Sequence, residues 1–170
     1  FAGNEALPEP YGALESRAAP KQDELLAAAL YAGRRLEALA FRSGGAAFWF
    51  APRSRGTRWA FGPAGLDLHL GIPGIILFLA HLGAVTGEAR FTGLARAGLA
   101  TVRGEMTESE ATALFGTLGA FSGWGGVIYT LTHLAVLWQD ESLWDDAERI
   151  ADGLEPRIVE DVLFDVVAGV

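Results

Sequence analysis

The sequence predicts an all-α fold of paired inner and outer helices, with a small β-hairpin near residues 47–61. The main observation is an internal repeat: residues 71–82 read GIPGIILFLAHL and residues 123–134 read GWGGVIYTLTHL, an offset of 52 (123 − 71). The same offset relates Ala95 to Ala147. Repeats of this length are typical of stacked helical units that bury a shared core. A third copy begins near Gly169, so we expect a partial array.

Composition indicates a globular domain. The chain has 170 residues, of which 51% are hydrophobic, and this length is sufficient for one ordinary core. It carries 13 basic and 21 acidic residues, a net charge of −8, which disfavours nucleic acid and anionic membrane surfaces as partners. No cysteine is present, which excludes disulfides, thiolate zinc ligands and a cysteine nucleophile within these residues.

The most apolar run, residues 66–85, is about the length of a membrane span. It contains Asp67, His69 and Pro73, so we expect a buried helix and no membrane span. The chain begins with Phe1 and has no basic segment before an apolar stretch. We therefore expect Phe1 to lie inside a longer, cytoplasmic protein.

The N-terminal third predicts a linker, a helix and a hairpin in that order. Residues 1–19 contain Gly and Pro without periodicity, which is typical of an irregular lead-in. From residue 20 to 42 apolar residues recur at helical spacing, and Gly44 follows as a stop signal. Short aromatic runs at 47–50 and 57–61 flank a Pro-Arg-Ser-Arg-Gly segment and predict the hairpin.

Two helix pairs are predicted next. They comprise 71–85 with 88–103, and 124–138 with 142–152. The first helix of each pair is apolar nearly all round and the second is amphipathic, which indicates an inner and an outer layer. Residues 105–112 are expected to be a loop or a short helix, and residues 155–163 a further turn of the outer layer.

Each inner helix opens with a Gly-x-x-Gly step, which has two interpretations. Glycines allow a tight turn and the close approach of neighbouring helix ends. A helix start also presents N–H groups that favour an anion or a polarised carbonyl. The spacing favours packing without excluding the second interpretation.

Aspartates occupy the position four residues before the glycine in two of the three copies. Asp67 precedes Gly71 and Asp165 precedes Gly169, whereas the second copy has Gly119. Such a carboxylate could cap the coming turn. It could also transfer protons if it lies at the mouth of a ring of helices. The spacing alone favours the cap.

The histidines and tryptophans have mainly structural interpretations. His81 and His133 share one repeat position, where a core or helix-contact role is favoured over ligation. His69 lies closer to the expected mouth but has no Cys, Asp or Glu at metal-like spacing. The five tryptophans are scattered, and most are expected to anchor the core or the interlayer space.

Residues 67–80, 119–129 and 165–169 together resemble the cyclase domain of class II lanthipeptide synthetases (LanM type) in the lanthionine synthetase C-like family. The resemblance runs from about Leu25 to Val170. Residues 20–170 are thereby identified as the N-terminal part of a LanC-like domain, truncated in its third unit.

The resemblance implies a partial α/α toroid that forms lanthionine and methyllanthionine rings. In this family a cysteine thiol of a precursor peptide adds to a dehydrated Ser or Thr, with zinc activating the thiol. The family's zinc ligands lie in later repeats, so no zinc is expected to be held by these residues, and the segment alone should be inactive. Asp165 matches the family's Asp-Val-x-x-Gly aspartate, implicated in acid–base chemistry. A dehydratase domain is expected to precede the cyclase.

Two other functions remain open from the sequence. A non-catalytic helical-repeat module could hold a peptide on its concave face without reacting with it. An α/α-barrel carbohydrate-active enzyme would need two acidic residues in a central cavity, and Asp67 with Asp165 is the available pair.

Overall fold

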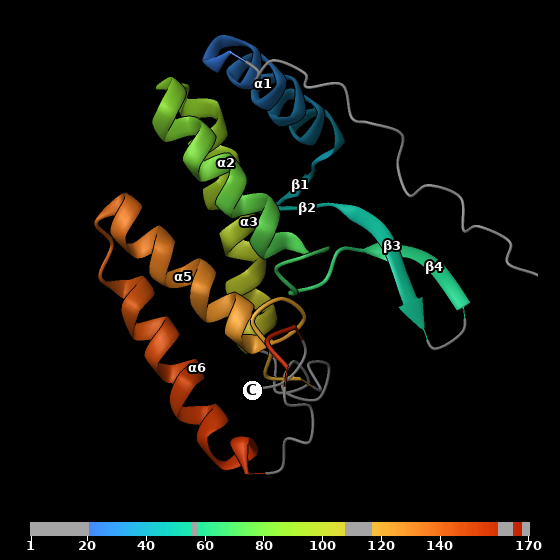
Figure 1. Ribbon diagram of the computed structural model, residues 1–170, viewed down its shortest axis with the longest axis vertical. Helices are drawn as coiled ribbons and strands as arrows, with labels where there is room; N and C mark the ends of the chain where they lie inside the picture. The colour runs from blue at the N-terminus through green and yellow to red at the C-terminus, as the bar shows by residue number, and fades with distance from the viewer. Residues whose placement is uncertain (1–20, 56–57, 108–116, 160–164, 168–170) are drawn as a thin grey trace, which may run out of the picture.

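The computed structural model describes residues 21–55, 58–107, 117–159 and 165–167 (Figure 1). The predicted linker over residues 1–19, Gly169 and most of the loop at 105–112 lie outside these residues. The elements in chain order are α1 (Gln22–Leu39), β1 (Phe41–Ser43), β2 (Ala46–Phe48), β3 (Phe50–Arg55), β4 (Arg58–Pro63), α2 (Ile72–Thr86), α3 (Ala89–Thr107), α5 (Trp124–Trp138) and α6 (Ser142–Ile158). The mainly helical, partial α/α fold predicted from the sequence is confirmed.

The repeat seen in the sequence is reproduced by the backbone. Helix α5 begins and ends 52 residues after α2 (124 − 72 and 138 − 86). Gly71 and Gly123 are the N-caps of the two helices, both in extended conformation. Each helix ends at a left-handed residue, Gly87 (φ 70°) in α2 and Gln139 (φ 53°) in α5. The two units therefore share their local geometry as well as their sequence pattern.

Two helix pairs pack against each other through an apolar core. Helix α2 packs on α3 and on α5, and α5 packs on α6. The largest fully buried side chains come from all four helices: Ile72, Ile76, Leu79, Phe91, Leu94, Leu131, Leu134 and Leu143. Burial of each such side chain contributes roughly 1.5–3 kcal/mol. The predicted pairing of an apolar helix with an amphipathic one is confirmed in both units.

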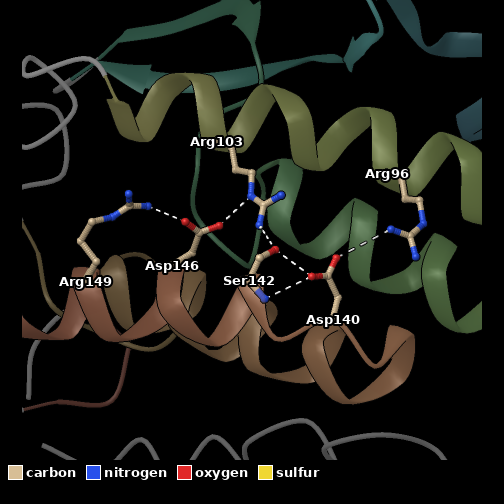
Figure 2. A network of polar contacts seen from close by, with 6 residues as sticks. All are labelled: Arg96, Arg103, Asp140, Ser142, Asp146 and Arg149. Atoms are coloured by element: carbon tan, nitrogen blue, oxygen red, sulfur yellow. Dashed lines mark hydrogen bonds and ion pairs between the residues drawn. The ribbon is translucent and has the colours of Figure 1, made fainter.

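A polar network joins the two amphipathic helices (Figure 2). Arg103 of α3 donates from Nε to Asp146 Oδ2 of α6 at 2.6 Å, and from Nη2 to Ser142 Oγ at 2.9 Å. The Ser142 hydroxyl in turn donates to Asp140 Oδ1 at 2.7 Å. Arg96 of α3 lies 4.0 Å from the Asp140 carboxylate. These contacts set α3 beside α6.

The small hairpin predicted near residues 47–61 is confirmed as the β3–β4 pair, and a second antiparallel hairpin, β1–β2, precedes it. Strand β1 pairs with β2, with Phe41 opposite Phe48, and β3 pairs with β4, with Phe50 opposite Pro63. The first hairpin turns at Gly44 and Gly45, whose φ angles of 58° and 85° favour glycine. Gly44 therefore belongs to a hairpin turn and does not end the preceding helix.

Helix boundaries differ from the predicted ones at several points. Helix α1 stops at Leu39 and not at residue 42, because Ala40 is extended and the next residues pair as β1. Helix α3 continues to Thr107, and α6 continues to Ile158 through residues expected to form a separate turn. The chain after residue 159 is described again only at 165–167.

Trp49 fixes the hairpins to the helices. Its side chain is buried, and its indole N–H donates to the Leu36 carbonyl of α1 at 2.8 Å. The Thr101 hydroxyl of α3 donates to the Ala47 carbonyl of β2 at 2.7 Å. The anchor role predicted for the tryptophans holds for Trp49 and Trp124, which are buried, but not for Trp144, which is exposed. The side chain of Trp59 lies outside the described residues.

Candidate functional site

The turns that precede the repeat helices are bonded to one another in a row. The N–H groups of Leu68 and His69 donate to the Phe121 carbonyl at 2.9 and 3.2 Å. In the next turn the N–H of Phe121 donates to the Val167 carbonyl at 3.3 Å. His69 and Phe121 are repeat-equivalent (121 − 69 = 52), so the same connection is made twice. The three turns thus form a continuous backbone layer at one end of the helical array.

Two further bonds reinforce the connection between the second and third turns. Ala120 N–H donates to the Val166 carbonyl and Ser122 N–H donates to the Val167 carbonyl, both at 2.9 Å. Together with the Phe121 bond, they make residues 120–122 and 166–167 a short paired segment. The sequence analysis missed this layer, because backbone bonds between loops leave no residue pattern.

The first glycine of each Gly-x-x-Gly step allows the turn to close on its own helix. The Ile72 N–H donates to the Gly65 carbonyl at 2.8 Å, and the equivalent Trp124 N–H donates to the Thr117 carbonyl at 3.3 Å. A Cβ at Gly71 would collide with the Gly65 carbonyl, and one at Gly123 would lie 2.5 Å from the Thr117 carbonyl. No larger residue fits these positions without displacing backbone.

The packing interpretation of these glycines is therefore favoured over anion binding. In the second unit the N–H groups of Trp124 and Gly125 already donate to the Thr117 and Leu118 carbonyls, the latter at 3.1 Å. In the first unit the Ile72 N–H is used in the same way. Because these donors are taken up by the preceding turn, the helix starts do not present a free cluster of N–H groups.

Both aspartates that the sequence selected close turns. Asp67 Oδ1 accepts the Leu70 N–H at 2.6 Å, which places a carboxylate cap before α2. Asp165 Oδ1 accepts the Val167 N–H at 2.8 Å. Asp165 is exposed, and it lies in the turn that bonds to residues 120–122. Each carboxylate accepts a hydrogen bond within its own turn, and neither bond supports the alternative of an α/α-barrel carbohydrate-active enzyme.

Apolar side chains surround the row of turns. Leu70 is 56% exposed, Phe121 43%, Val166 66% and Val167 51%. Phe121 and Val167 also make the backbone hydrogen bond that connects the second and third turns, so exposed apolar side chains belong to the bonded turns themselves. A row of exposed apolar groups beside an aspartate suits an extended peptide better than a small polar ligand.

Of the core or helix-contact role predicted for His81 and His133, the core position is wrong, since both side chains are exposed. The ring of His133 lies 4.1 Å from that of Tyr129, one turn earlier in α5. Both histidines line a groove of about 340 Å³ that also includes Val136 and Trp144. Their common repeat position thus reflects a common exposed face. His69 is also exposed, in the first turn.

The residues present do not fit the zinc site that the resemblance implies. Within the described part of the chain, no three His, Asp or Glu side chains cluster closely enough to hold a metal ion. The whole sequence lacks cysteine, which the implied ligand set requires.

Comparison with protein families identifies the architecture. The profile of the family described as lanthionine synthetase C-like protein matches residues 62–170. The chain belongs to this family. The match covers α2 to α6 and all three turns of the lanthionine synthetase C-like domain. It begins after most of the hairpin region, and so is shorter than the range from Leu25 that the motifs suggested.

Family membership gives a general function. Lanthionine synthetase C-like domains form a family of cyclase type that acts on peptide substrates. A search of curated proteins gave no match. Among the described residues, no helix of this lanthionine synthetase C-like domain combines the length and hydropathy that crossing a membrane requires.

Proposed function

We propose that this chain is part of a cyclase domain that closes lanthionine and methyllanthionine rings in a dehydrated, cysteine-containing peptide. The observation that carries the proposal is the row of three bonded turns in a chain of this family, in which Asp165 shares the third turn with Val167 and the Val167 carbonyl accepts the N–H of Phe121. An extended peptide could lie along this row, with its reacting residues near the Asp165 carboxylate.

The reaction is an addition without change of oxidation state. The cysteine Sγ of the peptide attacks Cβ of dehydroalanine or dehydrobutyrine, and the π electrons move to form an enolate. A proton then bonds to Cα, so that S and H have added across the double bond. Zinc, when bound in the complete domain, would lower the pKa of the thiol, and its ligands must come from residues other than those described above.

In this proposal Asp165 transfers the proton that the reaction moves. Its Oδ1 is held by the Val167 N–H, which orients the carboxylate in the third turn. A positioned acid or base of this kind contributes roughly 10²- to 10⁴-fold to a rate. We further propose that a dehydratase domain supplies the dehydrated peptide and that the protein is cytoplasmic.

Cyclisation by the complete protein tests the proposal. A dehydrated peptide is incubated with enzyme, and the remaining free thiols are counted by alkylation and mass spectrometry, since ring closure itself leaves the mass unchanged. Asp165→Asn should lower the rate by about 10²-fold or more while the zinc content stays constant, because the amide oxygen can still accept the Val167 N–H.

Asp67→Asn is the matched control, since it changes the repeat-equivalent carboxylate and keeps its cap. Its cyclisation rate should remain within about twofold of the unmodified enzyme, a change of roughly 0.4 kcal/mol in barrier. An unchanged rate for Asp165→Asn would rule out proton transfer by this residue. Peptide binding without any cyclisation by the unmodified protein would instead favour the non-catalytic binding module.

A further inference from the structure

The two hairpins display a cluster of phenylalanines on four strands. Phe41 stacks on Phe48 with ring centroids 5.5 Å apart, and Phe50 stacks on Phe61 at 5.8 Å. Phe41 and Phe50 connect the two pairs edge to face at 5.0 Å. These distances lie in the range of favourable aromatic pairs. We call these four residues the phenylalanine ladder.

Much of the ladder is exposed. Phe61 is 74% exposed, Phe41 53% and Phe50 40%. The β3–β4 hairpin projects away from the helices, so the described helices do not cover it (Figure 1). Exposed apolar clusters of this kind mark interaction sites more often than isolated exposed residues do.

The base of the hairpins is held firmly. Trp49 lies between the two hairpins in sequence, is buried, and bonds to α1, while β2 bonds to α3. The ladder is therefore presented on a fixed support, which lowers the ordering cost of binding. All four phenylalanines of the ladder precede Gly62, where the family match begins, so the shared family function does not account for them.

The charge of this region is opposite to that of the rest of the chain. Residues 38–66 contain four arginines and no acidic residue, a charge of +4, while the remaining residues carry −12 (−8 − 4). Arg42 lies on β1 and is exposed. Arg53, Arg55 and Arg58 belong to β3 and β4. An acidic partner would be attracted by the net positive charge of this segment, whereas the remaining residues together carry a net negative charge.

The charge of residues 38–66 also argues against other binding partners at the ladder. Two copies that docked through this same surface would bring two basic hairpins together, and like charges across an interface are unfavourable. Nucleic acid and anionic membranes would be attracted by the arginines but repelled by the −12 of the remaining chain. A short peptide can approach the projecting hairpin alone and avoid that repulsion.

We propose that the phenylalanine ladder binds an acidic segment of the peptide substrate, in extended form, with apolar side chains on the rings. Among the described residues β3 has β4 as its strand partner, so the two-stranded sheet keeps edges to which a peptide strand can add. The identity of this peptide as the substrate rests on the proposed cyclase function, whereas the binding chemistry does not.

Direct binding tests the chemistry of the site. The probe is a fluorescein-labelled peptide of alternating Glu and Leu, compared by anisotropy with peptides of alternating Lys and Leu and of Glu and Ser. The Glu/Leu peptide should bind most tightly, and raising the salt from about 0.05 M to about 0.3 M should weaken it because the charges are screened. Equal binding of the Lys/Leu peptide, or no binding of the Glu/Leu peptide, would overturn the proposal.

Variants locate the binding to the ladder. Phe61→Ser should weaken binding of the Glu/Leu peptide by about fivefold or more, the loss expected for an aromatic anchor. Tyr31→Ser is the matched control, because Tyr31 is 69% exposed but lies on α1. Arg42→Gln is a second variant that leaves the ladder intact and should also weaken binding.

Equal affinity of Phe61→Ser and Tyr31→Ser for the Glu/Leu peptide would contradict the assignment. Displacement of the peptide by an oligonucleotide or by phosphatidylglycerol vesicles would contradict it as well.

The complete protein separates this inference from the proposed function. With a dehydrated substrate that has an acidic segment, Phe61→Ser should raise KM about fivefold and leave kcat unchanged, because the ladder does not touch the reacting atoms. An unchanged KM with normal cyclisation would contradict docking at the ladder while the cyclase function stands. Peptide binding without cyclisation would leave the ladder assigned and refute the cyclase.

Discussion

The backbone N–H of His69 donates to the carbonyl oxygen of Phe121 at 3.2 Å, which joins the first repeat turn to the second. Phe121 makes the equivalent bond to Val167 in the third turn. These backbone bonds therefore fix the position of each turn relative to the other two, independently of the side chains that the turns carry. This explains how an exposed aspartate in the third turn can be held in a defined position relative to the first two.

Replacement of the turn glycine should destabilise the fold. A Cβ at Gly123 would lie 2.5 Å from the Thr117 carbonyl oxygen and 2.7 Å from the Gly119 nitrogen, both backbone atoms that cannot rotate away. Gly123→Ala should lower the free energy of unfolding by roughly 1–3 kcal/mol, as overpacking does. Gly93→Ala is the control, because nothing lies within 4 Å of a Cβ there and the helix should gain about 0.5–1 kcal/mol. Urea unfolding measures both, and equal stability of the two variants would contradict the close approach.

Removal of the Asp67 cap should cost stability without requiring the charge. Asp67→Ala leaves the Leu70 N–H without this acceptor and should lower the free energy of unfolding by about 1 kcal/mol. Asp67→Asn keeps an oxygen at the same position and should stay within about 0.5 kcal/mol, since the two residues are similar caps. A larger loss in Asp67→Asn than in Asp67→Ala would show that the carboxylate acts in some other way.

Asp146 should stabilise the contact between α3 and α6. Its side chain is 15% exposed and accepts from Arg103 at 2.6 Å and from Arg149 within its own helix. Asp146→Ala should lower the free energy of unfolding by about 1 kcal/mol, with a smaller effect at high salt, because these arginines are partly exposed. Asp152→Ala, at an exposed position of the same helix, should change stability by less than about 0.5 kcal/mol. Equal effects of the two changes would argue against the network.

The free energy of unfolding should fall in the acid pH range because of Asp140. The Ser142 hydroxyl bonded to its carboxylate, assisted by the Ser142 N–H and by Arg103 and Arg96, holds the pKa of Asp140 below its ordinary value of 3.8. Because the folded pKa is lower than the unfolded one, this contribution to stability is complete above pH 3.8 and is lost as the pH falls through the folded pKa.

Ser142→Ala removes the largest cause of that shift. The pKa of Asp140 should then move toward its ordinary value, and the acid-induced loss of stability between about pH 2 and about pH 5 should become shallower. Carbon-detected NMR titration of the Asp140 carboxyl gives the pKa, and urea unfolding gives the stability. If the titration of Asp140 is the same with and without the serine hydroxyl, the hydrogen bond does not control it.

The repeat and the glycine positions could be read from the sequence because they follow from local rules. The helices were predicted close to their observed bounds, and the structure relates both ends of α5 to those of α2 by the offset of 52, since each helix opens at a Gly-x-x-Gly step. The cap role of Asp67 was also accessible, because an aspartate three residues before its N–H partner is a local pattern. The first hairpin was missed although Gly44 and Gly45 mark it, because the same glycine also fits a helix end.

The exposure of His81 and His133 could not be read in this way. A histidine in an apolar helix faces the core or the surface according to which neighbours pack on that helix, and the sequence does not fix those neighbours. The paired backbone of residues 120–122 and 166–167 was inaccessible for a similar reason, since backbone bonds between loops leave no residue pattern.

The sequence by itself determined the family, the helical repeat, the turn glycines and the candidate aspartates, because these depend on periodicity and on residue types at fixed spacing. Only the tertiary structure decided that the three turns are bonded in a row, that Asp165 lies in the turn bonded to Phe121, and that the phenylalanines of two hairpins form one exposed ladder. Those relationships join residues far apart in the chain, and they arise from packing of whole elements, which no local spacing encodes.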